Sequence, residues 1–470
     1  MDFSRYLPRA LCCQPRGSAS QEDLSSPTPT PAPITTVVIG AGVIGLSTAY
    51  YLALALNKTA SYMPPSSEPD IVVIDSSHDI CPGASGKATG SLGDFGFGSE
   101  TALLGTLSYQ LHKELASKYN GGEIYEFSDL KIFRVSKNDT GNPSTPDTWG
   151  PSPPVNKTIS DLPSWINPSN DWDVQSLAEV PYASHLDPEK FCRFLRHRCE
   201  MLGIRFLLNS AVISVQRNDA RQSFTGVTVQ TRDETHSTHT IACRAVVIAA
   251  GPWSTRVFSR LFPAGRLDLR MDSTNSAGHY ALVRNPRWTP GDDEHGVTQI
   301  YLNDVANGLN RLDITSFLSG YLYIGGWGAK PERLPEFAEG VQGQPDEIEA
   351  MLNMVRQYLR LEAHEELEIV KSGRAYRPLT APNIPTITKV NWEMLGNSKA
   401  TPESEGPRNG FKQQQQQQHG SPVIGGLYLN TGHNSDGITL GPGSGKVMSE
   451  LLLGRTPSVS TSNFGFTSTK

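Results

Sequence analysis

The sequence lacks an excess of positive charge and lacks a long unbroken apolar run. Its 470 residues carry a formal net charge of −6, whereas proteins that bind nucleic acid or anionic membranes typically carry clustered basic residues. The longest apolar stretch, residues 37–56, is interrupted by Gly40, Gly42 and Gly45, and no run reaches the length of a membrane span. We therefore expect neither a nucleic-acid partner nor a membrane span.

Cysteine is scarce and scattered. The six cysteines show no pairing typical of a metal site, which suits a reducing compartment. His197 and Cys199 share a helical segment with Cys192, but packing and surface exposure explain them better than ligation. The first residues lack the apolar core of a signal peptide. We expect no metal site and a cytoplasmic location.

Several stretches are too polar or too rich in proline to be regular structure. Residues 1–33 are predicted to be a disordered tail, Lys137–Asp171 a long surface loop, residues 396–420 a disordered insertion with six consecutive glutamines, and residues 456–470 a second tail. The glutamine run suits either an interaction tract or tolerated surface expansion. Regular elements are predicted between them: a strand at 35–39, helices at 43–56, 187–204 and 345–361, and strands at 70–75, 205–216, 224–231 and 243–251.

A glycine turn joins the first strand to the first helix. Residues 40–45, Gly-Ala-Gly-Val-Ile-Gly, fit the G-x-G-x-x-G pattern in the strand–turn–helix context that a dinucleotide-binding fingerprint requires. Gly40 permits the turn, Gly42 admits a pyrophosphate and Gly45 lets helix and strand pack closely. Asp75 ends the next strand, where an acid suits the unphosphorylated ribose of FAD or NAD. The alternative is a glycine turn without a ligand.

Four further stretches help to decide which dinucleotide is bound. They are "GASGKATGS" from Gly83, "SAVISV" from Ser210, "VVIAAGPWS" from Val246 and "LYLNTGHNSDGITLGPGSGK" from Leu427. Together they resemble the D-amino-acid-oxidase-like family of FAD oxidoreductases, which includes glycine oxidase and sarcosine oxidase. Within them, "ASGKATG" and "GHNSDGITLGPGSG" resemble a fungal branch of that family. The serine of "GPWS" lacks a G-x-S-x-G elbow, which argues against a hydrolase.

The resemblance implies an α/β fold with two domains. A discontinuous Rossmann-like FAD-binding domain would comprise residues 34–105, 185–262 and 371–455. An antiparallel-sheet α+β substrate domain would comprise residues 106–184 and 263–370.

The resemblance also implies which residues contact FAD. It places Gly40, Gly42, Ile44 and Gly45 in the pyrophosphate turn, Asp75 at the ribose, Val212 at the adenine, Ala84, Ser85, Gly86 and Lys87 beside the pyrophosphate or flavin, Ala249, Gly251 and Trp253 along the cofactor channel, and Gly432, His433, Gly437, Ile438 and Thr439 at the flavin ring. A helix N-terminus after Gly443 would stabilise negative charge on that ring. A loop histidine such as His433 often only supports its own turn.

Three residues are candidates for the chemistry. Arg377 matches the family position at which an arginine before proline grips the substrate carboxylate, and the planar guanidinium suits that pairing. The alternative is a surface or ion-paired arginine. Tyr323 and Lys330 belong to the stretch Tyr321–Glu332, which looks like the strand that lines the family's substrate cavity. The alternative is a core strand with Lys330 in solvent. No cysteine follows Cys243, which excludes the cysteinyl flavin link of some relatives. A histidyl link stays open, and we expect non-covalent FAD.

The sequence favours oxidation of an amine or amino acid by hydride transfer to the flavin, with possible reoxidation by oxygen. The expected partner is a small-molecule substrate. Two alternatives stay open: an FAD oxidoreductase acting on a hydroxy acid or secondary metabolite, and a flavin-binding protein of regulation or trafficking with little turnover.

Overall fold

The computed structural model describes residues 35–59, 70–137, 150–269, 271–272, 276–289, 296–304, 309–328, 330–381, 383–396 and 423–466. All of them belong to one compact unit, residues 33–470. The predicted tail at 1–33 and the predicted insertion after Gly396 lie outside the described residues.

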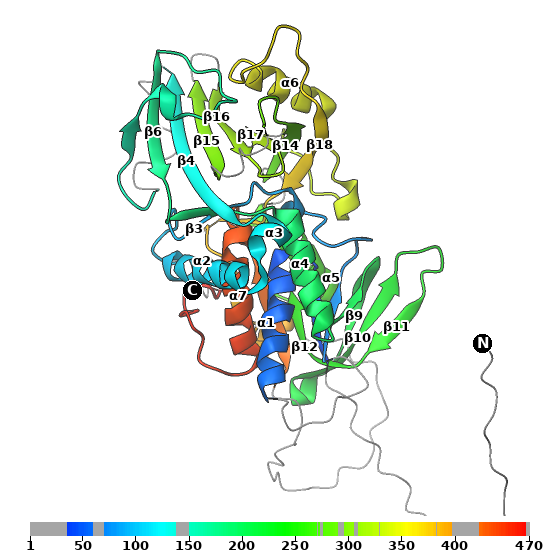
Figure 1. Ribbon diagram of the computed structural model, residues 1–470. Coiled ribbons are helices and arrows are strands. Elements are labelled where there is room, and N and C mark those ends of the chain that lie inside the picture. The colour runs from blue at the N-terminus through cyan, green and yellow to red at the C-terminus, as the bar shows by residue number, and fades with distance from the viewer. Residues whose placement is uncertain are drawn as a thin grey trace, which may run out of the picture. The chain divides into compact units, whose positions relative to one another are not determined.

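A largely parallel sheet forms the first layer (Figure 1). Its strands follow the order β20-β21-β12-β1-β2-β8, and only β20 runs antiparallel to its neighbour. The strands are β1 (Thr35–Ile39), β2 (Ile71–Ile74), β8 (Arg205–Leu207), β12 (Cys243–Ile248), β20 (Thr386–Lys389) and β21 (Gly426–Thr431). Strand β1 lies between β2 and β12, so the turn that follows it opens at the carboxyl edge of the sheet, where open α/β sheets bind ligands.

The parallel sheet is buried on both faces, which explains its continuous apolar strands. Val38 and Val73 face the helices α1 (Val43–Thr59), α4 (Pro188–Met201) and α7 (Gly437–Leu452). Val37 and Val72 face the opposite layer. That layer is α5 (Ser254–Leu261) with an antiparallel sheet of β9 (Ser210–Asn218), β10 (Ser223–Thr231) and β11 (Thr238–Ile241).

A second, larger and mostly antiparallel sheet lies above the first in Figure 1. Its main path is β18-β14-β17-β16-β15-β4-β6-β5, where β15 and β4 are parallel. The strands are β4 (Ser128–Lys137), β5 (Val155–Lys157), β6 (Trp172–Ala178), β14 (Ala277–Arg284), β15 (Val297–Asp304), β16 (Leu309–Ser316), β17 (Tyr321–Gly328) and β18 (Ile369–Tyr376), with β3 (Ser91–Gly93) and β7 (Ala183–His185) attached beside β4. The remaining elements are α2 (Ala102–Tyr119), α3 (Gly121–Tyr125), α6 (Pro345–Val355) and the short pair β13 (Met271–Asp272) and β19 (Leu379–Thr380).

Alternation along the strands gives the large sheet two different faces. On β15, Ile300 and Leu302 join an apolar core with α6, whereas Gln299 and Tyr301 point to the other side. Since successive strand residues face opposite sides, the same sheet carries a dry core and a polar wall. The mixed α/β class is therefore confirmed, including the antiparallel second sheet.

Several predicted elements differ in detail. The strand expected at 205–216 is two strands in different sheets, because Asn209 between β8 and β9 adopts a positive φ. The described part of the expected surface loop at 137–171 contains strand β5 and the buried Trp165 and Ile166. The expected C-terminal tail packs against the body of the protein through buried Phe464.

The last helix starts earlier than predicted. We expected its N-terminus after Gly443, but α7 begins at Gly437 and contains Pro442. A proline inside a helix has no N–H for the carbonyl four residues before it, here Ile438. His112 of α2 supplies the missing donor, because its Nε2 lies 3.0 Å from the Ile438 carbonyl oxygen. The His112 imidazole is therefore protonated on Nε2.

This histidine makes the stability of the fold depend on pH. Burial lowers the pKa of His112 to about 4 from an ordinary 6.5. Between those values the unfolded chain binds more protons, so the contribution is complete above pH 6.5 and is lost as the pH falls towards 4, by roughly 3 kcal/mol.

Replacing His112 by leucine tests this contact. His112→Leu leaves the Ile438 carbonyl without a donor and should lower the free energy of unfolding at neutral pH by about 1–3 kcal/mol. The variant should also lose less stability than the parent on acidification from pH 6.5 to 4. Denaturant unfolding across that range measures both effects, with the exposed His197→Leu as the control. Parallel pH profiles for parent and His112→Leu would contradict this role.

Candidate functional site

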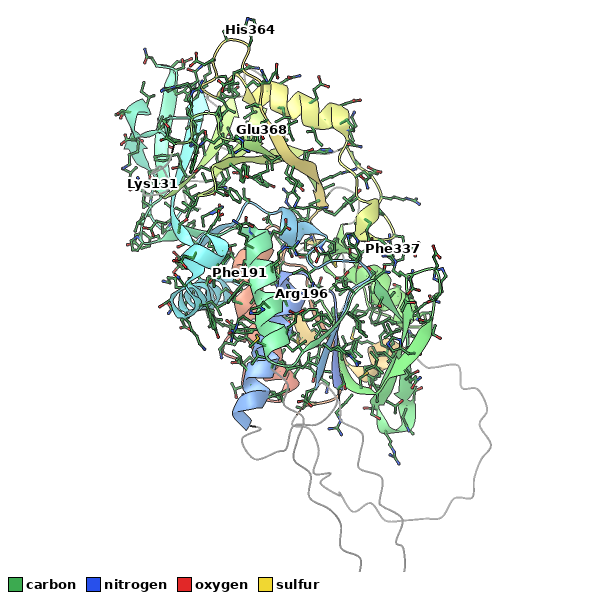
Figure 2. The ribbon with its side chains drawn as sticks, turned by 45° about the vertical axis from the view of Figure 1, so that its right-hand side comes forward. Lys131, Phe191, Arg196, Phe337, His364 and Glu368 are labelled. Carbon is green, nitrogen blue, oxygen red and sulfur yellow. The ribbon has the colours of Figure 1, made fainter. Side chains whose placement is uncertain are left out.

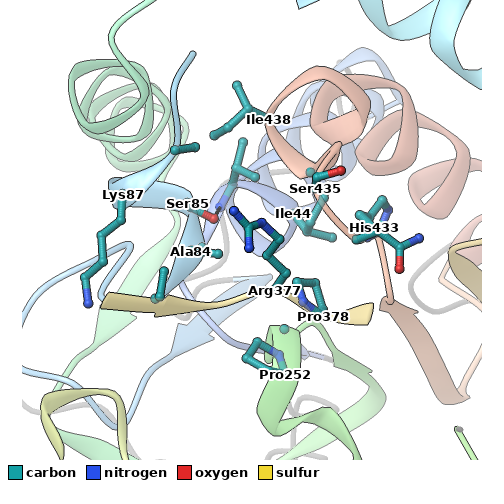
Figure 3. Close-up of a pocket in the computed structure, with 18 of the residues that line it drawn as sticks. Ile44, Ala84, Ser85, Lys87, Pro252, Arg377, Pro378, His433, Ser435 and Ile438 are labelled. Carbon is teal, nitrogen blue, oxygen red and sulfur yellow. Dashed lines mark hydrogen bonds between the residues drawn. The ribbon is translucent and has the colours of Figure 1, made fainter. Parts of the chain in front are cut away.

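A cavity of about 480 Å³ lies where the two large sheets meet. Its walls come from the turn after β1, from the segment after β2, from the end of β12, from the Gly432–Thr439 segment and from the polar face of the antiparallel sheet. Figure 3 shows residues from several of these segments around Arg377. The first and last predicted motifs are thus brought together although they are nearly 400 residues apart in the sequence.

The three glycines of the first turn have different surroundings. A Cβ on Gly45 would lie 1.9 Å from the Gly40 carbonyl oxygen, so Gly45 permits close packing of helix and strand and does not line the cavity. Gly40 adopts a φ of +113°, and a Cβ there would meet the Ala249 carbonyl oxygen at 2.4 Å. A Cβ on Gly42 would meet only the Ser85 side chain, at 3.1 Å, and would otherwise project into the cavity.

Asp75 stands beside this turn. Its Oδ2 accepts the Ala41 N–H at 2.7 Å, and its Oδ1 accepts the Ser77 N–H at 2.8 Å. Burial raises the pKa of the Asp75 carboxyl to about 6, against the effect of those two hydrogen bonds. At neutral pH the carboxylate is therefore largely ionised, and Asp75 lines the cavity.

The segment after β2 forms the short helix η1 (Ala84–Lys87), whose Ala84, Ser85 and Lys87 line the cavity. Ser85 Oγ accepts the Val43 N–H at 3.1 Å, which ties this segment to the start of α1. Gly86 faces away, because a Cβ there would lie 2.6 Å from the Cys81 carbonyl oxygen. Lys87 Nζ donates to the Arg374 carbonyl at 3.2 Å, and burial lowers its pKa.

The glycine turn, the segment after β2, the start of β9, the end of β12 and the Gly432–Thr439 segment form one wall of the cavity, which we name the lower wall. Val212, Ala249, Gly251 and Trp253 line the cavity, as do Ile44, Gly432, His433, Gly437, Ile438 and Thr439. His433 donates to or accepts from Ser444 Oγ at 2.8 Å, and burial lowers its pKa to about 3, so the imidazole is neutral. The first N–H groups of α1 and α7 have no acceptor within their own helices, and both helix N-termini face the cavity.

Arg377 and Tyr323 lie on the opposite wall. The Arg377 guanidinium rests against Gly278, where a Cβ would meet Nη1 at 2.9 Å, and no described carboxylate forms an ion pair with it. Tyr323 donates from its hydroxyl to the Lys87 carbonyl at 3.0 Å, and its ring stacks on Tyr280 at 5.7 Å. Burial raises the pKa of Tyr323, so the phenol is neutral.

Lys330 does not join this group. Its side chain is 77% exposed, forms an ion pair with Glu347 at 2.9 Å and is not among the residues that line the cavity. The structure therefore does not bring Lys330 to the cavity. The chain leaves the sheet after Gly328, so the strand's alternation no longer directs this side chain to the cavity.

The sequence did not indicate a row of polar residues on the same wall. Ser91 Oγ donates to Gln299 Oε1 at 2.7 Å, and Gln299 Nε2 donates to Asp313 Oδ1 at 2.8 Å. Thr439 of α7 donates to the Ser91 carbonyl at 3.3 Å, which connects both walls of the cavity. Only the alternation of polar and apolar residues around Gln299 and Asp313 could have pointed to these positions.

The residues around the cavity suit FAD in their chemistry. Two helix N-termini offer N–H groups to a pyrophosphate or to an electron-rich ring. An ionised carboxylate, Asp75, lies beyond the glycine turn for ribose hydroxyls, and Gly42 leaves the space that a side chain would fill.

The comparisons agree with this fit. Residues 35–451 match the family model described as FAD-dependent oxidoreductase, DAO. This chain belongs to that family. C1F5.03c of Schizosaccharomyces pombe is similar, at 23% identity over 435 residues that cover 89% of this chain and 93% of that protein.

Solved structures share the fold of this FAD-dependent oxidoreductase. Glycine oxidase from Geobacillus kaustophilus superposes with a TM-score of 0.62 at 17% identity, covering 92% of this chain and 98% of its own. L-Amino acid deaminase from Proteus myxofaciens, solved with anthranilate, gives a TM-score of 0.62 at 16% identity and covers 93% of both chains.

The described residues offer neither a membrane span nor a metal site. No helix in that part of the oxidoreductase is long and apolar enough to cross a membrane. No group of three or more histidine, cysteine, aspartate or glutamate residues there is arranged to hold a metal ion.

Proposed function

We propose that this protein oxidises a small amine that carries a carboxylate, such as an amino acid. The observation that supports this most strongly is Arg377, whose guanidinium lines the cavity without an ion-pair partner among the described residues. Arg377 is half-buried, and a partly desolvated charge without an ion-pair partner favours an anionic ligand in the cavity.

The proposed cofactor is non-covalent FAD, which supplies the hydride acceptor when bound. The residues that would hold it are those of the lower wall: Gly40, Gly42, Ile44, Asp75, Ala84, Ser85, Lys87, Val212, Ala249, Gly251, Trp253, Gly432, His433, Gly437, Ile438 and Thr439. Gly45 and Gly86 would not contact FAD. They would allow close packing of their segments against the backbone at Gly40 and Cys81. Acid precipitation should release the yellow colour into solution.

The residues of the opposite wall would position the substrate. Arg377 would pair with its carboxylate, and the stacked Tyr280 and Tyr323 would shield the reacting carbon from water. Tyr323 would contact the substrate as an uncharged ring and would not transfer a proton, because its hydroxyl donates to the Lys87 carbonyl. Asp313 and Gln299 would present polar atoms to the amine side of the substrate.

A panel of substrates under air tests the proposal. Amino acids, N-methyl amino acids, simple amines and 2-hydroxy acids should be compared for oxygen uptake and for reduction of an artificial electron acceptor. We expect turnover with a carboxylate-bearing amine and release of ammonium or a primary amine. Turnover of 2-hydroxy acids alone, without any amine product, would refute the amine class while retaining the carboxylate contact.

A further inference from the structure

A short segment that follows strand β17 of the antiparallel sheet lines part of the cavity. Residues 334–339, which we name the strap, lie between β17 and α6, and three of them, Glu336, Phe337 and Ala338, line the cavity. Figure 2 labels Phe337 at this crossing. The strap lies near Asp75, because Arg232 contacts both Glu339 of the strap and the carbonyl of Ser76, the residue after Asp75.

The segment after β12 holds the first half of the strap. Arg256 of α5 donates from Nη1 to the Pro335 carbonyl at 2.5 Å and from Nη2 to the Leu334 carbonyl at 2.9 Å. Trp253 Nε1 donates to the same Pro335 carbonyl at 2.9 Å. Two side chains that line the cavity thus fix the strap through its backbone.

Arg232 holds the second half. Its guanidinium carbon lies 3.6 Å from the centre of the Phe337 ring, and its Nη1 lies 3.2 Å from Glu339 Oε1. The same nitrogen donates to the carbonyl of Ser76, the residue after Asp75. One face of Phe337 is therefore covered by Arg232, beside the segment that carries Asp75.

We propose that the strap is part of the cofactor site and covers the adenosine half of FAD. This rests on the proposed position of FAD, with its pyrophosphate at Gly42 and its ribose at Asp75. With Arg232 on one face, the Phe337 ring offers its other face as a flat apolar surface for the adenine, and Arg256 and Trp253 keep the strap in place. Selection of FAD over FMN, which lacks adenosine, follows from this arrangement.

Flavin binding to the apoprotein tests the strap separately from catalysis. Dissociation constants and release rates for FAD and FMN should be measured from flavin fluorescence, with Phe337→Ala, Arg256→Ala and the control Arg284→Ala. Arg284 forms an exposed ion pair with Glu368 and does not line the cavity. Stacking of a base on an aromatic side chain predicts that Phe337→Ala weakens FAD binding about 5- to 150-fold and speeds release, with FMN binding unchanged.

The outcomes are distinguishable. Equal losses of FAD and FMN affinity in Phe337→Ala, or no change in either, would overturn the strap proposal alone. A parent protein that binds no FAD would overturn the proposed function as well. Arg256→Ala should act in the same direction as Phe337→Ala, and if Arg256→Ala does not fold, Phe337→Ala carries the test.

Discussion

Replacing Arg377 by alanine is expected to leave FAD bound and to slow flavin reduction by a carboxylate substrate strongly. Truncating one partner of a buried charge pair costs on the order of 2–5 kcal/mol, with a factor of ten for each 1.4 kcal/mol. Arg377 touches Gly278 on the sheet and no described acid, so its removal should disturb substrate binding more than folding. Stopped-flow reduction of the flavin measures the effect.

Matched substrates and variants make this test specific. A neutral amide analogue of the substrate should lose much less rate than the acid in Arg377→Ala, and Arg377→Lys should recover part of the acid's rate because an ammonium cannot form the planar fork. Arg374, three residues earlier, is the control: it is buried and paired with Glu332. Arg374→Ala should lower stability without distinguishing acid from amide. Equal losses for acid and amide in Arg377→Ala would assign Arg377 a structural role.

Replacing Gly42 by valine is expected to abolish FAD binding while the apoprotein still folds. The nearest protein atom to a Cβ at this position is Ser85 Oγ, at 3.1 Å, and the next is at 4.0 Å. The added methyl groups would therefore occupy the space proposed for the pyrophosphate rather than clash with backbone. The ratio of flavin to protein after purification measures the loss.

Gly45→Val is the matched variant for this prediction. Its Cβ would lie 1.9 Å from the Gly40 carbonyl oxygen, so helix α1 would have to move away from β1. We expect Gly45→Val to lower the melting temperature of the apoprotein itself, whereas Gly42→Val should not. A Gly42→Val protein that retains a full complement of FAD would show that the pyrophosphate lies elsewhere.

Local sequence patterns led to most of the residues that line the lower wall of the cavity. The glycine turn, the acid at the end of β2 and the small residues before α7 are each encoded within a short stretch, and the structure gathers most of them around one cavity. Their relative positions follow from β1 lying between β2 and β12 in a parallel sheet.

The features that the sequence did not predict depend on contacts between residues that lie far apart in the chain. Helix α7 continues through Pro442 because His112, more than 300 residues earlier, supplies the missing donor. Gln299 meets Asp313 only because β15 and β16 pair in one register. The strap reaches the cavity because Arg232 and Arg256 bind it, and no local pattern around Phe337 reveals those contacts.

Anaerobic mixing of the oxidised holoprotein with its carboxylate-bearing amine is the most direct test of the proposed function. We predict that the flavin is bleached in a single turnover, with one equivalent of oxidised product per flavin, and that the same amine without its carboxylate bleaches it far more slowly. If dithionite reduces the bound flavin but no amine or amino acid does, the cavity does not serve amine oxidation and the proposed function is wrong.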